Sequence, residues 1–474
     1  MRSPLFISAL MLTACQLGEG SEPEPFVFES RPAVIVRGED WESQRFDEFA
    51  DSLGVPRATA AVFDDGQVIR VRHRGEGVDE NALFQAASMS KAVAAAGIVT
   101  YAMDRGIGLD DDLAPLITSL DLQAIEGVDG PVTLRALLSH TAGATVSGFP
   151  GYAAGSAVPS NLEVVLGSGS ANTEPVALTK RKGRYSYSGG GFQIAQLFVE
   201  DHSGRPFAEV MEELVLAPLG MTRSSFSQPI DPDRLEGVHI VPAELGDGPL
   251  EGGWHTYPEL ASAGLWTTAE DYGKFAVAVG RAYRGETDAG LRPEVARAML
   301  TPVDKDYGLG LQILSREGKP VSFSHGGSNA GYKAFFRGSA LEADAVVVLT
   351  NHPAGSQFAN DIVRGSFARL AADGIDEQTL ARVAMSEETR ARCLGPYAPD
   401  GGDSVAFSLT VRNGQVFLSD EGGDEEVIHT GDGQFVLRNG GYQLECLKDE
   451  RGAYLLAGQS LRFDRITQGE PSTR

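Results

Sequence analysis

Ser88 and Lys91 are the two residues of this sequence whose types and spacing best suit covalent chemistry. They open an alanine-rich segment, and residues three apart on a helix share one face, so the Lys91 amine can reach the Ser88 hydroxyl. A serine hydroxyl is a weak nucleophile until a neighbouring basic group activates it. The start of a helix also stabilises negative charge that develops nearby. No other Ser-x-x-Lys occurs in the chain, although a surface lysine after a helix cap would give the same pattern.

Tyr187 is the second candidate, because it stands just before three glycines in the segment 185–191. A free tyrosine has a pKa of about 10 and is not a base at neutral pH. An adjacent ammonium such as that of Lys91 would make its phenolate accessible, and the phenolate could then take the proton of Ser88. The glycines let backbone segments approach closely, as a crowded site requires. A core tyrosine before a glycine-rich turn is the alternative interpretation.

The third candidate is the segment 324–332, which carries His325, Gly326, Gly327 and Ser328 between two strand-like runs. Glycines on a strand indicate that a ligand or another backbone comes close. A backbone N–H here could stabilise an oxyanion, and His325 could contact a substrate carboxylate or a leaving group. His-Gly-Gly also occurs in the oxyanion loop of α/β-hydrolases. That class needs a Gly-x-Ser-x-Gly elbow, which this sequence lacks.

Taken in this order, the three motifs resemble those of the serine hydrolases related to class C β-lactamases and D-alanyl-D-alanine peptidases. Four further segments resemble the same family, and the likeness covers roughly residues 31–372; the segments are 84–88, 134–143, 218–222 and 263–268. The resemblance implies that Ser88 is the acylated nucleophile and that Lys91 and Tyr187 share the proton transfers. It also implies an oxyanion hole made by the backbone N–H groups of Ser88 and Ser328.

The same resemblance places substrate contacts at Gly189, His325, Gly326 and Gly327. The family often has Asn two positions after the tyrosine, where it holds the substrate amide, and this sequence has Gly189 there. His325 also stands where many members have Lys. Both departures argue against efficient β-lactam hydrolysis and favour peptidase, amidase or esterase activity on other acyl compounds.

A protein without turnover, which binds a cell-wall or antibiotic ligand as a sensor or scaffold, is the alternative function. The intact set of Ser88, Lys91 and Tyr187 favours the enzyme. The loop 144–176 is predicted to overhang the site and to select the substrate. His140 could be another base, but a satisfied structural histidine beneath the site is the preferred interpretation.

Residue spacing and composition argue against metals, cofactors and nucleic acids as ligands. No metal-binding spacing such as His-Glu-x-x-His is present, so neither a metal nor a cofactor is expected. Acidic residues exceed basic ones by 65 to 40, a net charge of −25. That excess argues against nucleic-acid binding, since few cations remain to neutralise phosphates. The expected partner is a small-molecule, peptide or ester acyl substrate.

Hydrophobic periodicity predicts a scaffold for these residues. It indicates a helix at 41–53, a strand pair at 58–72, a helix at 87–104, strands at 321–324, 332–337 and 345–350, and a closing helix at 358–370. Strands near both ends with helices between them predict an α/β sandwich. The resemblance makes this a β-lactamase/transpeptidase-like sandwich of an antiparallel sheet with helices on both faces, plus a helical subdomain. We assign it to residues 31–375, followed by a linker at 376–393.

The first 14 residues predict an export signal. One charge, Arg2, precedes a short apolar run that ends in Leu-Thr-Ala-Cys, and about ten apolar residues are too few to span a bilayer. The ending resembles a bacterial lipobox, in which Cys15 is lipidated and becomes the mature N-terminus; an ordinary signal with an incidental cysteine is the alternative. Residues 15–30 are predicted to be a flexible tether.

The expected location is the bacterial cell envelope, with membrane contact through the lipid only. The residue after Cys15 is Gln16 and not the Asp that usually retains a lipoprotein at the inner membrane. In a cell with two membranes, the protein is therefore expected at the periplasmic face of the outer membrane.

From residue 394 to 474 the periodicity changes to two. Asn413-Gly414 lies between two strand-like runs, a strong hairpin signal, and further strands at 434–437, 442–446 and 453–456 complete a meander. A small all-β, barrel-like module is therefore predicted. With Cys15 lipidated, Cys393 and Cys446 are the remaining cysteines, and an oxidising compartment would allow them to pair. Two unrelated buried thiols are the alternative.

Overall fold

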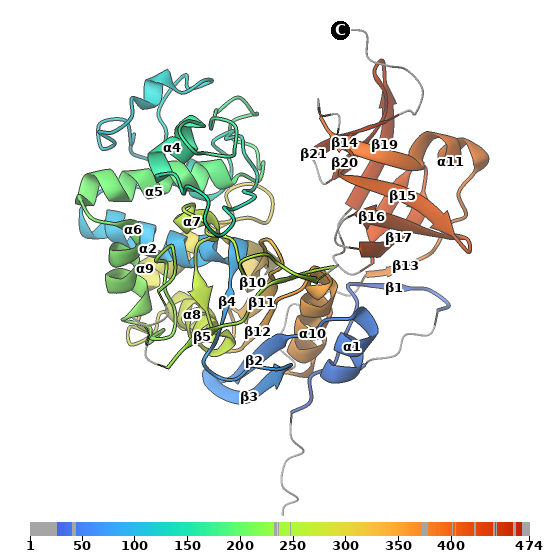
Figure 1. Ribbon diagram of the computed structural model, residues 1–474, viewed down its shortest axis with the longest axis horizontal. Coiled ribbons are helices and arrows are strands. Elements are labelled where there is room, and N and C mark those ends of the chain that lie inside the picture. Colours follow the sequence, from blue (N-terminus) through green and yellow to red (C-terminus); the bar gives the residue numbers. More distant parts are fainter. Residues whose placement is uncertain are drawn as a thin grey trace, which may run out of the picture.

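The computed structural model describes residues 26–39, 44–231, 235, 237–246, 248–370, 378–400, 402, 404–420, 423–438, 441, 443–457 and 461–466. The predicted signal peptide, Cys15, most of the tether and the start of the first predicted helix lie outside these residues. Figure 1 shows a larger α/β unit beside a smaller β-barrel, which is formed by the C-terminal part of the chain.

A six-stranded antiparallel sheet organises the α/β unit, and it joins segments far apart in sequence as predicted. Its strands, in spatial order, are β3 (Gln67–Arg74), β2 (Ala58–Asp64), β12 (Ala345–Thr350), β11 (Lys333–Ser339), β10 (Lys319–Ser328) and β9 (Gln312–Arg316). The edge strand β9 was not predicted. It is short, and its five residues include only one that is buried, so it carries little of the alternation by which strands are recognised.

Alternating small and branched residues let both faces of the sheet be buried. Val346 and Val348 face α1 (Phe46–Leu53) and α10 (Gly355–Arg369), whereas Val347 and Leu349 face the core on the side of α8 (Ala269–Tyr283). Successive side chains on a strand point to opposite faces, so a continuous apolar run is what a doubly covered strand requires. The sandwich predicted from the sequence is confirmed.

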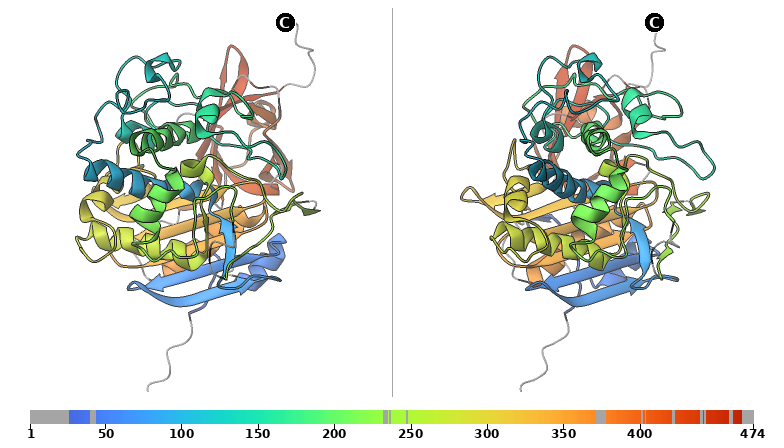
Figure 2. Two further views of the ribbon diagram at one scale, coloured as in Figure 1. Left: turned by 60° about the vertical axis from the view of Figure 1, so that its left-hand side comes forward. Right: turned by 90° about the vertical axis from the view of Figure 1, so that its left-hand side faces the viewer.

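The remaining helices form a subdomain on one side of the sheet, as the turned views in Figure 2 show. They are α2 (Ser90–Asp104), α3 (Leu134–Leu138), α4 (Asn161–Leu166), α5 (Gly189–Ser203), α6 (Phe207–Met211), α7 (Leu260–Ala263) and α9 (Pro293–Met299), with short helices η1 (Ala87–Met89), η2 (Leu122–Ala124) and η3 (Glu212–Leu216). The helices α2 and α5 are buried along nearly their whole length and form the centre of this core.

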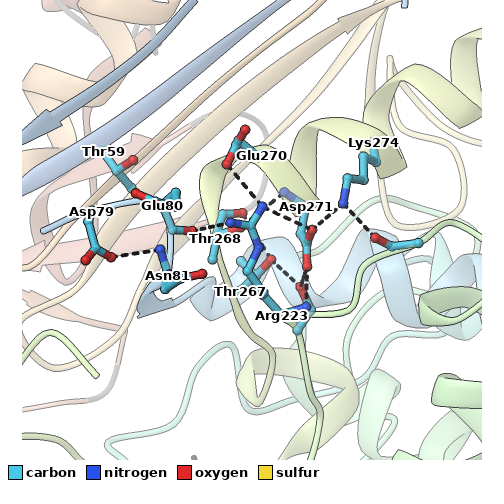
Figure 3. A network of polar contacts seen from close by, with 12 residues as sticks. Thr59, Asp79, Glu80, Asn81, Arg223, Thr267, Thr268, Glu270, Asp271 and Lys274 are labelled. Carbon is cyan, nitrogen blue, oxygen red and sulfur yellow. Dashed lines mark hydrogen bonds and ion pairs between the residues drawn. The ribbon is translucent and has the colours of Figure 1, made fainter. Parts of the chain in front are cut away.

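A three-stranded sheet leads directly into the segment that carries Ser88. It contains β5 (His239–Ile240), β4 (Ala82–Gln85) and β8 (Trp266–Thr267), and a hairpin of β6 (Glu244–Leu245) and β7 (Gly248–Pro249) lies nearby. A polar network at the start of α8 fixes β8 (Figure 3). The fully buried Asp271 accepts hydrogen bonds from the Arg223 backbone, the Ser224 hydroxyl and the Lys274 amine. The Arg223 guanidinium in turn donates to the carbonyl oxygen of Glu80, just before β4.

The C-terminal module is a closed barrel of eight antiparallel strands. They are β14 (Gly395–Pro399), β15 (Phe407–Arg412), β16 (Gln415–Asp420), β17 (Gly423–Gly431), β18 (Gln434–Leu437), β19 (Gln443–Asp449), β20 (Gly452–Ala457) and β21 (Leu461–Arg465). The predicted all-β module and its hairpin at Asn413-Gly414 are confirmed. Closure pairs β14 with β21, a contact between distant segments that local periodicity does not indicate.

Two predicted segments are more structured than expected. The predicted linker contains β13 (Gln378–Leu380), which pairs in parallel with β1 (Val34–Val36), and α11 (Glu387–Cys393), which ends in the barrel core at Cys393. The predicted tether also ends too late, because Phe28 is buried and its ring lies 5.5 Å from that of Phe46. The packed unit therefore includes residues from 26 onward, and the described part of the predicted linker, residues 378–393, forms regular secondary structure at both of its ends.

Cys393 and Cys446 form a disulfide, with Cα atoms 5.8 Å apart. The bond joins α11 to β19 across the core of the barrel. Within the described residues, no helix is both long enough and apolar enough to cross a membrane.

Candidate active site

Ser88 lies in η1, immediately before α2, and is half-buried between two fully buried neighbours. The preceding Ala87 has a φ of +50°, an uncommon conformation for a residue with a side chain. Ser90 holds this turn, because its hydroxyl donates to the Ala87 carbonyl oxygen at 2.5 Å and accepts the Leu265 N–H at 3.0 Å. The strained turn thus presents the Ser88 hydroxyl at the start of the helix.

The structure brings Lys91 to Ser88 as the spacing predicts. The Lys91 Nζ donates to the Ser88 Oγ at 3.2 Å and to the carbonyl oxygen of Ser262 at 2.9 Å. The side chain is only 2% exposed, and burial lowers the pKa of its amine to about 7. Burial disfavours the charged form, so a large fraction of the amine is neutral at neutral pH. A neutral amine within hydrogen-bond distance of a hydroxyl can act as its general base.

Tyr187 lies just before α5 and also reaches Ser88. The backbone N–H of Ser186 donates to the His140 carbonyl oxygen at 2.8 Å, and that of Ser188 donates to the His140 Nδ1 at 3.1 Å, so His140 holds both neighbours of Tyr187. The Lys91 Nζ lies 5.0 Å from the centre of the Tyr187 ring, and the side chains of Tyr187 and Ser88 are hydrogen-bonded.

The prediction of an accessible Tyr187 phenolate is wrong. Burial raises the pKa of Tyr187 to about 12, and its hydrogen bond with Ser88 offsets only part of this effect. Lys91 cannot compensate, since its amine lies over the ring and is itself readily deprotonated in this environment. Tyr187 is therefore protonated at neutral pH, and Lys91 is the one of the two groups whose pKa suits a base.

A chain of hydrogen bonds runs behind the catalytic side chains from His140 through Tyr307 to His325. The His140 Nδ1 accepts the Ser188 N–H, so its proton is on Nε2, which lies 3.2 Å from the Tyr307 hydroxyl. The His325 Nδ1 lies 2.6 Å from the Gly326 carbonyl oxygen and so carries the proton, which leaves Nε2 to accept from Tyr307 at 3.1 Å. The two ends of the chain thus fix both tautomers. Both ring nitrogens of His140 have hydrogen-bond partners, which agrees with its preferred interpretation as a structural histidine beneath the site.

His325 is a buried, uncharged residue of the site. Both of its ring nitrogens are engaged, and burial, reinforced by the nearby charge of Lys91, lowers its pKa to about 3. A neutral imidazole with both nitrogens occupied does not attract a substrate carboxylate. The neutral ring thus does not favour a contact between His325 and a substrate carboxylate, and the contact with a leaving group stays a prediction.

The segments that carry the predicted oxyanion-hole residues, Ser88 and Ser328, touch each other at Gly327. A Cβ atom on Gly327 would lie 2.3 Å from the Ala86 carbonyl oxygen, so only glycine allows this approach. Gly326 differs, since a Cβ there would meet nothing closer than 3.5 Å. Ser328, the last residue of β10, is exposed, and its hydroxyl accepts a hydrogen bond from Lys333 at 2.5 Å.

Gly189 opens α5, and the space beside it is filled. A Cβ atom on Gly189 would lie 2.5 Å from the ring of Phe149, which belongs to the loop 144–176 predicted to overhang the site. The Gly189 carbonyl oxygen accepts from the Ser262 hydroxyl at 2.9 Å. An asparagine at this position would collide with Phe149, which gives a physical reason for the departure seen in the sequence.

Sequence reasoning missed Tyr307, Ser262 and Asn329. Tyr307 links the two histidines, Ser262 offers its carbonyl oxygen to Lys91, and the Asn329 side chain donates to the Gln85 Oε1 at 2.7 Å. None of these residues has a chemical motif of its own. Asn329 follows Ser328 directly, and that adjacency was the one available signal.

Among the described residues, no group of three or more histidine, cysteine or acidic side chains is arranged to hold a metal ion. The fold and the site together define a serine hydrolase related to the β-lactamases. The family described as "Beta-lactamase" matches residues 43–368, more than half of the chain, and the protein belongs to that family.

A D-aminopeptidase from Gluconobacter oxydans (strain 621H) is 29% identical over 185 residues, which are 37% of this chain and 33% of the relative. The alignment thus spans about a third of that relative's length. The SurE structure with D-Leu has a TM-score of 0.58 at 22% identity, over 89% of this chain and 97% of SurE. An octameric penicillin-binding protein homologue from Pyrococcus abyssi has a TM-score of 0.56 at 18% identity, over 88% of this chain and 97% of the homologue. The D-amino acid amidase from Ochrobactrum anthropi has a TM-score of 0.52 at 19% identity, over 68% of this chain and 96% of the amidase. These structures share the fold.

Proposed function

We propose that the protein hydrolyses amide or ester bonds through an acyl-enzyme on Ser88. One observation carries the proposal: a nearly fully buried lysine amine, with a pKa of about 7, lies 3.2 Å from a serine hydroxyl at the start of a helix. A surface lysine after a helix cap, the structural alternative, would be exposed and fully charged. An amine that is neutral and aimed at a hydroxyl is suited to remove its proton.

In the proposed acylation step, the Ser88 Oγ attacks the acyl carbon while its proton passes to the Lys91 Nζ. The oxyanion that forms accepts hydrogen bonds from the backbone N–H groups of Ser88 and Ser328. Tyr187, protonated because of its burial, gives its proton to the leaving amine or alkoxide and regains one from the Lys91 ammonium. Water then attacks the acyl carbon while Lys91 takes its proton. The bond between the acyl carbon and the Ser88 Oγ breaks, and the Lys91 ammonium returns the proton to the Ser88 Oγ.

The proposed substrates are amides, peptides or esters that carry a D-amino acid, rather than β-lactams. The D-aminopeptidase and D-amino acid amidase relatives support this class. The contact of Phe149 with Gly189 supports it as well, because the ring occupies the place of the amide-binding asparagine of related β-lactamases. Weak β-lactam hydrolysis remains compatible with the site.

A panel of substrates tests this function. Purified protein is assayed with D-amino acid amides, D-amino acid p-nitrophenyl esters, the matching L-compounds and a chromogenic cephalosporin. We expect preferential turnover of the D-compounds and complete loss in Ser88→Ala. Acylation without product release would favour the alternative, a binding protein without turnover. Equal activity of Ser88→Ala would contradict the proposal.

We further propose that the protein is a lipoprotein of the bacterial cell envelope, anchored through Cys15. The lipobox-like ending at residues 12–15 supports the anchor. Export would also suit a disulfide of the kind found between Cys393 and Cys446. Cells grown with labelled palmitate should incorporate it into the natural protein and not into Cys15→Ser, which should leave the membrane fraction. A Cys15→Ser protein that remained in the membrane would refute this assignment.

A further inference from the structure

A pocket of about 620 Å³ lies where the barrel meets the α/β unit. The barrel contributes residues of β21 and the end of β14, including Arg462 and Phe463, and the α/β unit contributes the segment 180–186 and Lys305. Figure 1 shows β14 and β21 on the side of the barrel that faces the α/β unit. The volume falls within the range of about 300–1,000 Å³ that is usual for small-molecule sites.

The lining of this pocket is strongly basic, although the chain as a whole is acidic. It includes one acidic residue, Asp400, and five basic ones: Lys180, Arg181, Arg184, Lys305 and Arg462. The chain has only eight lysines and a net charge of −25. Basic residues thus outnumber acidic ones in the lining by five to one, although carboxylates just outside it pair with two of them. The cations that stay unpaired attract anions to this place.

Some of these cations already have acidic partners, and others do not. Arg462 pairs with Asp449 and Asp464, and Arg184 lies 3.5 Å from Asp304. Among the described residues, no carboxylate lies within ion-pair distance of Lys180, Arg181 or Lys305.

Burial has a cost for two of these unpaired cations. It lowers the pKa of both the Lys180 and the Lys305 amine, although the carboxylate of Asp304 opposes this at Lys305. A bound anion would compensate the partly buried charges.

The pocket also borders the chain segment that leads to Tyr187. Its lining includes Tyr185 and Ser186, which directly precede Tyr187, and Ser147, whose carbonyl oxygen accepts the Gly189 N–H at 3.3 Å. The Tyr185 ring lies 5.0 Å from that of Tyr307, behind the site. A ligand in the pocket would thus extend along the same segment that presents Tyr187.

We propose that this pocket binds an anionic group, a carboxylate or a phosphate, at the end of the substrate remote from the bond that is cleaved. The inference rests on the proposed function and adds the substrate class, namely acyl compounds with an acidic group. Because His325 is neutral and fully hydrogen-bonded, the third motif supplies no cation for such a group. Arginine guanidinium groups bind carboxylate and phosphate through two parallel hydrogen bonds, which suits Arg181.

Calorimetric titration tests the pocket without reference to catalysis. The full-length protein is titrated with glutarate, with inorganic phosphate and with neutral glutaramide at low salt. We expect binding of at least one anion and none of glutaramide. The tighter anion identifies carboxylate or phosphate as the ligand chemistry.

Two variants locate the binding. Lys180→Gln/Lys305→Gln should weaken the affinity for the anion by about tenfold or more. Lys182→Gln is the matched control, because Lys182 lies between Lys180 and Arg184 in sequence, pairs with Asp129 and is not part of the pocket lining. Loss of affinity in the double variant alone supports the site. No binding by the natural protein, or undiminished binding by the double variant, overturns it.

A pair of esters tests the link to the substrate. One ester ends in a free carboxylate and the other in its methyl ester, and the ratio of their kcat/KM values is compared between proteins. The natural protein and Lys182→Gln should prefer the acidic ester by about tenfold, and Lys180→Gln/Lys305→Gln should lose the preference. An unchanged ratio in the double variant overturns the assignment to the substrate. If no ester is cleaved, the proposed hydrolase function fails, while the titration still decides whether the pocket binds anions.

Discussion

The chemistry of single residues in this site depends on how far each group is removed from water. Lys91 and Tyr187 have ordinary pKa values near 10 in solution, yet burial moves them in opposite directions, to about 7 and about 12. Burial disfavours the ammonium of one and the phenolate of the other. The result is a neutral base and a neutral acid on either side of one hydroxyl, a pairing that acid–base catalysis uses.

The pH dependence of activity should report the Lys91 amine. Because the amine must be neutral to take the Ser88 proton, kcat/KM should be low in acid, rise with pH through about 7 and then level off. An uncharged ester assayed between about pH 5 and pH 9 gives the profile. A flat profile across neutrality, or activity that falls as the pH rises through 7, would show that Lys91 is not the base.

Removing either proton-transfer group should lower the rate without disturbing the fold. Lys91→Ala and Tyr187→Phe should each reduce the rate of acylation by about 10² or more. The double variant should lose far less than the product of the two effects, since the residues act as one unit. Tyr101→Phe is a suitable control, because the Tyr101 hydroxyl bonds His202 and not the site. A Tyr187→Phe protein as active as the control would exclude Tyr187 from the proton transfers.

Sequence patterns identified these residues but not their protonation states. The spacing of Ser88 and Lys91 places an amine beside a hydroxyl, whereas its pKa depends on burial by residues such as Ser262, 171 positions away from Lys91. The same holds for His325, whose partner Tyr307 is not part of any motif. The sequence predicts which residue types lie close together along the chain. It does not predict the charge of a buried group, because that charge depends on all the residues that surround it in the fold.

At the scale of secondary-structure elements, the site depends on how closely β10 approaches η1. The contact is made by Gly327, where a Cβ atom would lie 2.3 Å from the Ala86 carbonyl oxygen, a distance that forces the backbone to move. Since the two segments carry Ser328 and Ser88, any such movement would separate the proposed oxyanion-hole donors.

Gly327→Ala should therefore lower kcat by about 10² or more, the scale of a lost oxyanion-hole donor. Gly130→Ala is the control, because its new Cβ would meet no atom within 4 Å and the residue lies outside the candidate site. Steady-state kinetics with one ester, together with circular dichroism to confirm folding, decides the comparison. Equal activities of the two variants would mean that the close approach has no role in catalysis.

The elements that sequence predicted well are those with a strong apolar pattern. The strands β2, β10, β11 and β12 and the helix α10 are largely buried, so their residue types follow the sheet or helix period. β13 and β21 were missed because both are short; β13 pairs with the distant β1, and β21 pairs with the distant β14 as well as with the neighbouring β20. Pairing between strands that are far apart in sequence depends on the assembled fold, so the residue pattern of a short strand does not predict it.

At the scale of the whole molecule, the barrel is held to the α/β unit by ordered contacts. β1 pairs with β13, and Glu39 and Glu426 form ion pairs with Arg382 and Arg438 between the N-terminal strand and the barrel. The described part of the predicted linker is therefore tied to both neighbours, and these contacts hold the barrel beside the α/β unit.

The disulfide should stabilise this barrel measurably. Cys393 and Cys446 are 53 residues apart, and closing a loop of that length is worth about 4 kcal/mol in the chain-entropy account. Cys393→Ala/Cys446→Ala should lower the urea midpoint of the barrel transition, and reductant should lower that of the natural protein to a similar value. A midpoint that neither change affects would show that the bond adds no stability.

The central claim is that Ser88 becomes acylated because Lys91 activates it, and labelling tests this most directly. The protein is treated with a fluorophosphonate probe, digested and mapped by mass spectrometry, alongside Ser88→Ala and Lys91→Ala. We predict one adduct, on Ser88, with none in Ser88→Ala and labelling at least about 10² slower in Lys91→Ala. An adduct on another serine, or equal labelling of Ser88→Ala, would contradict the account.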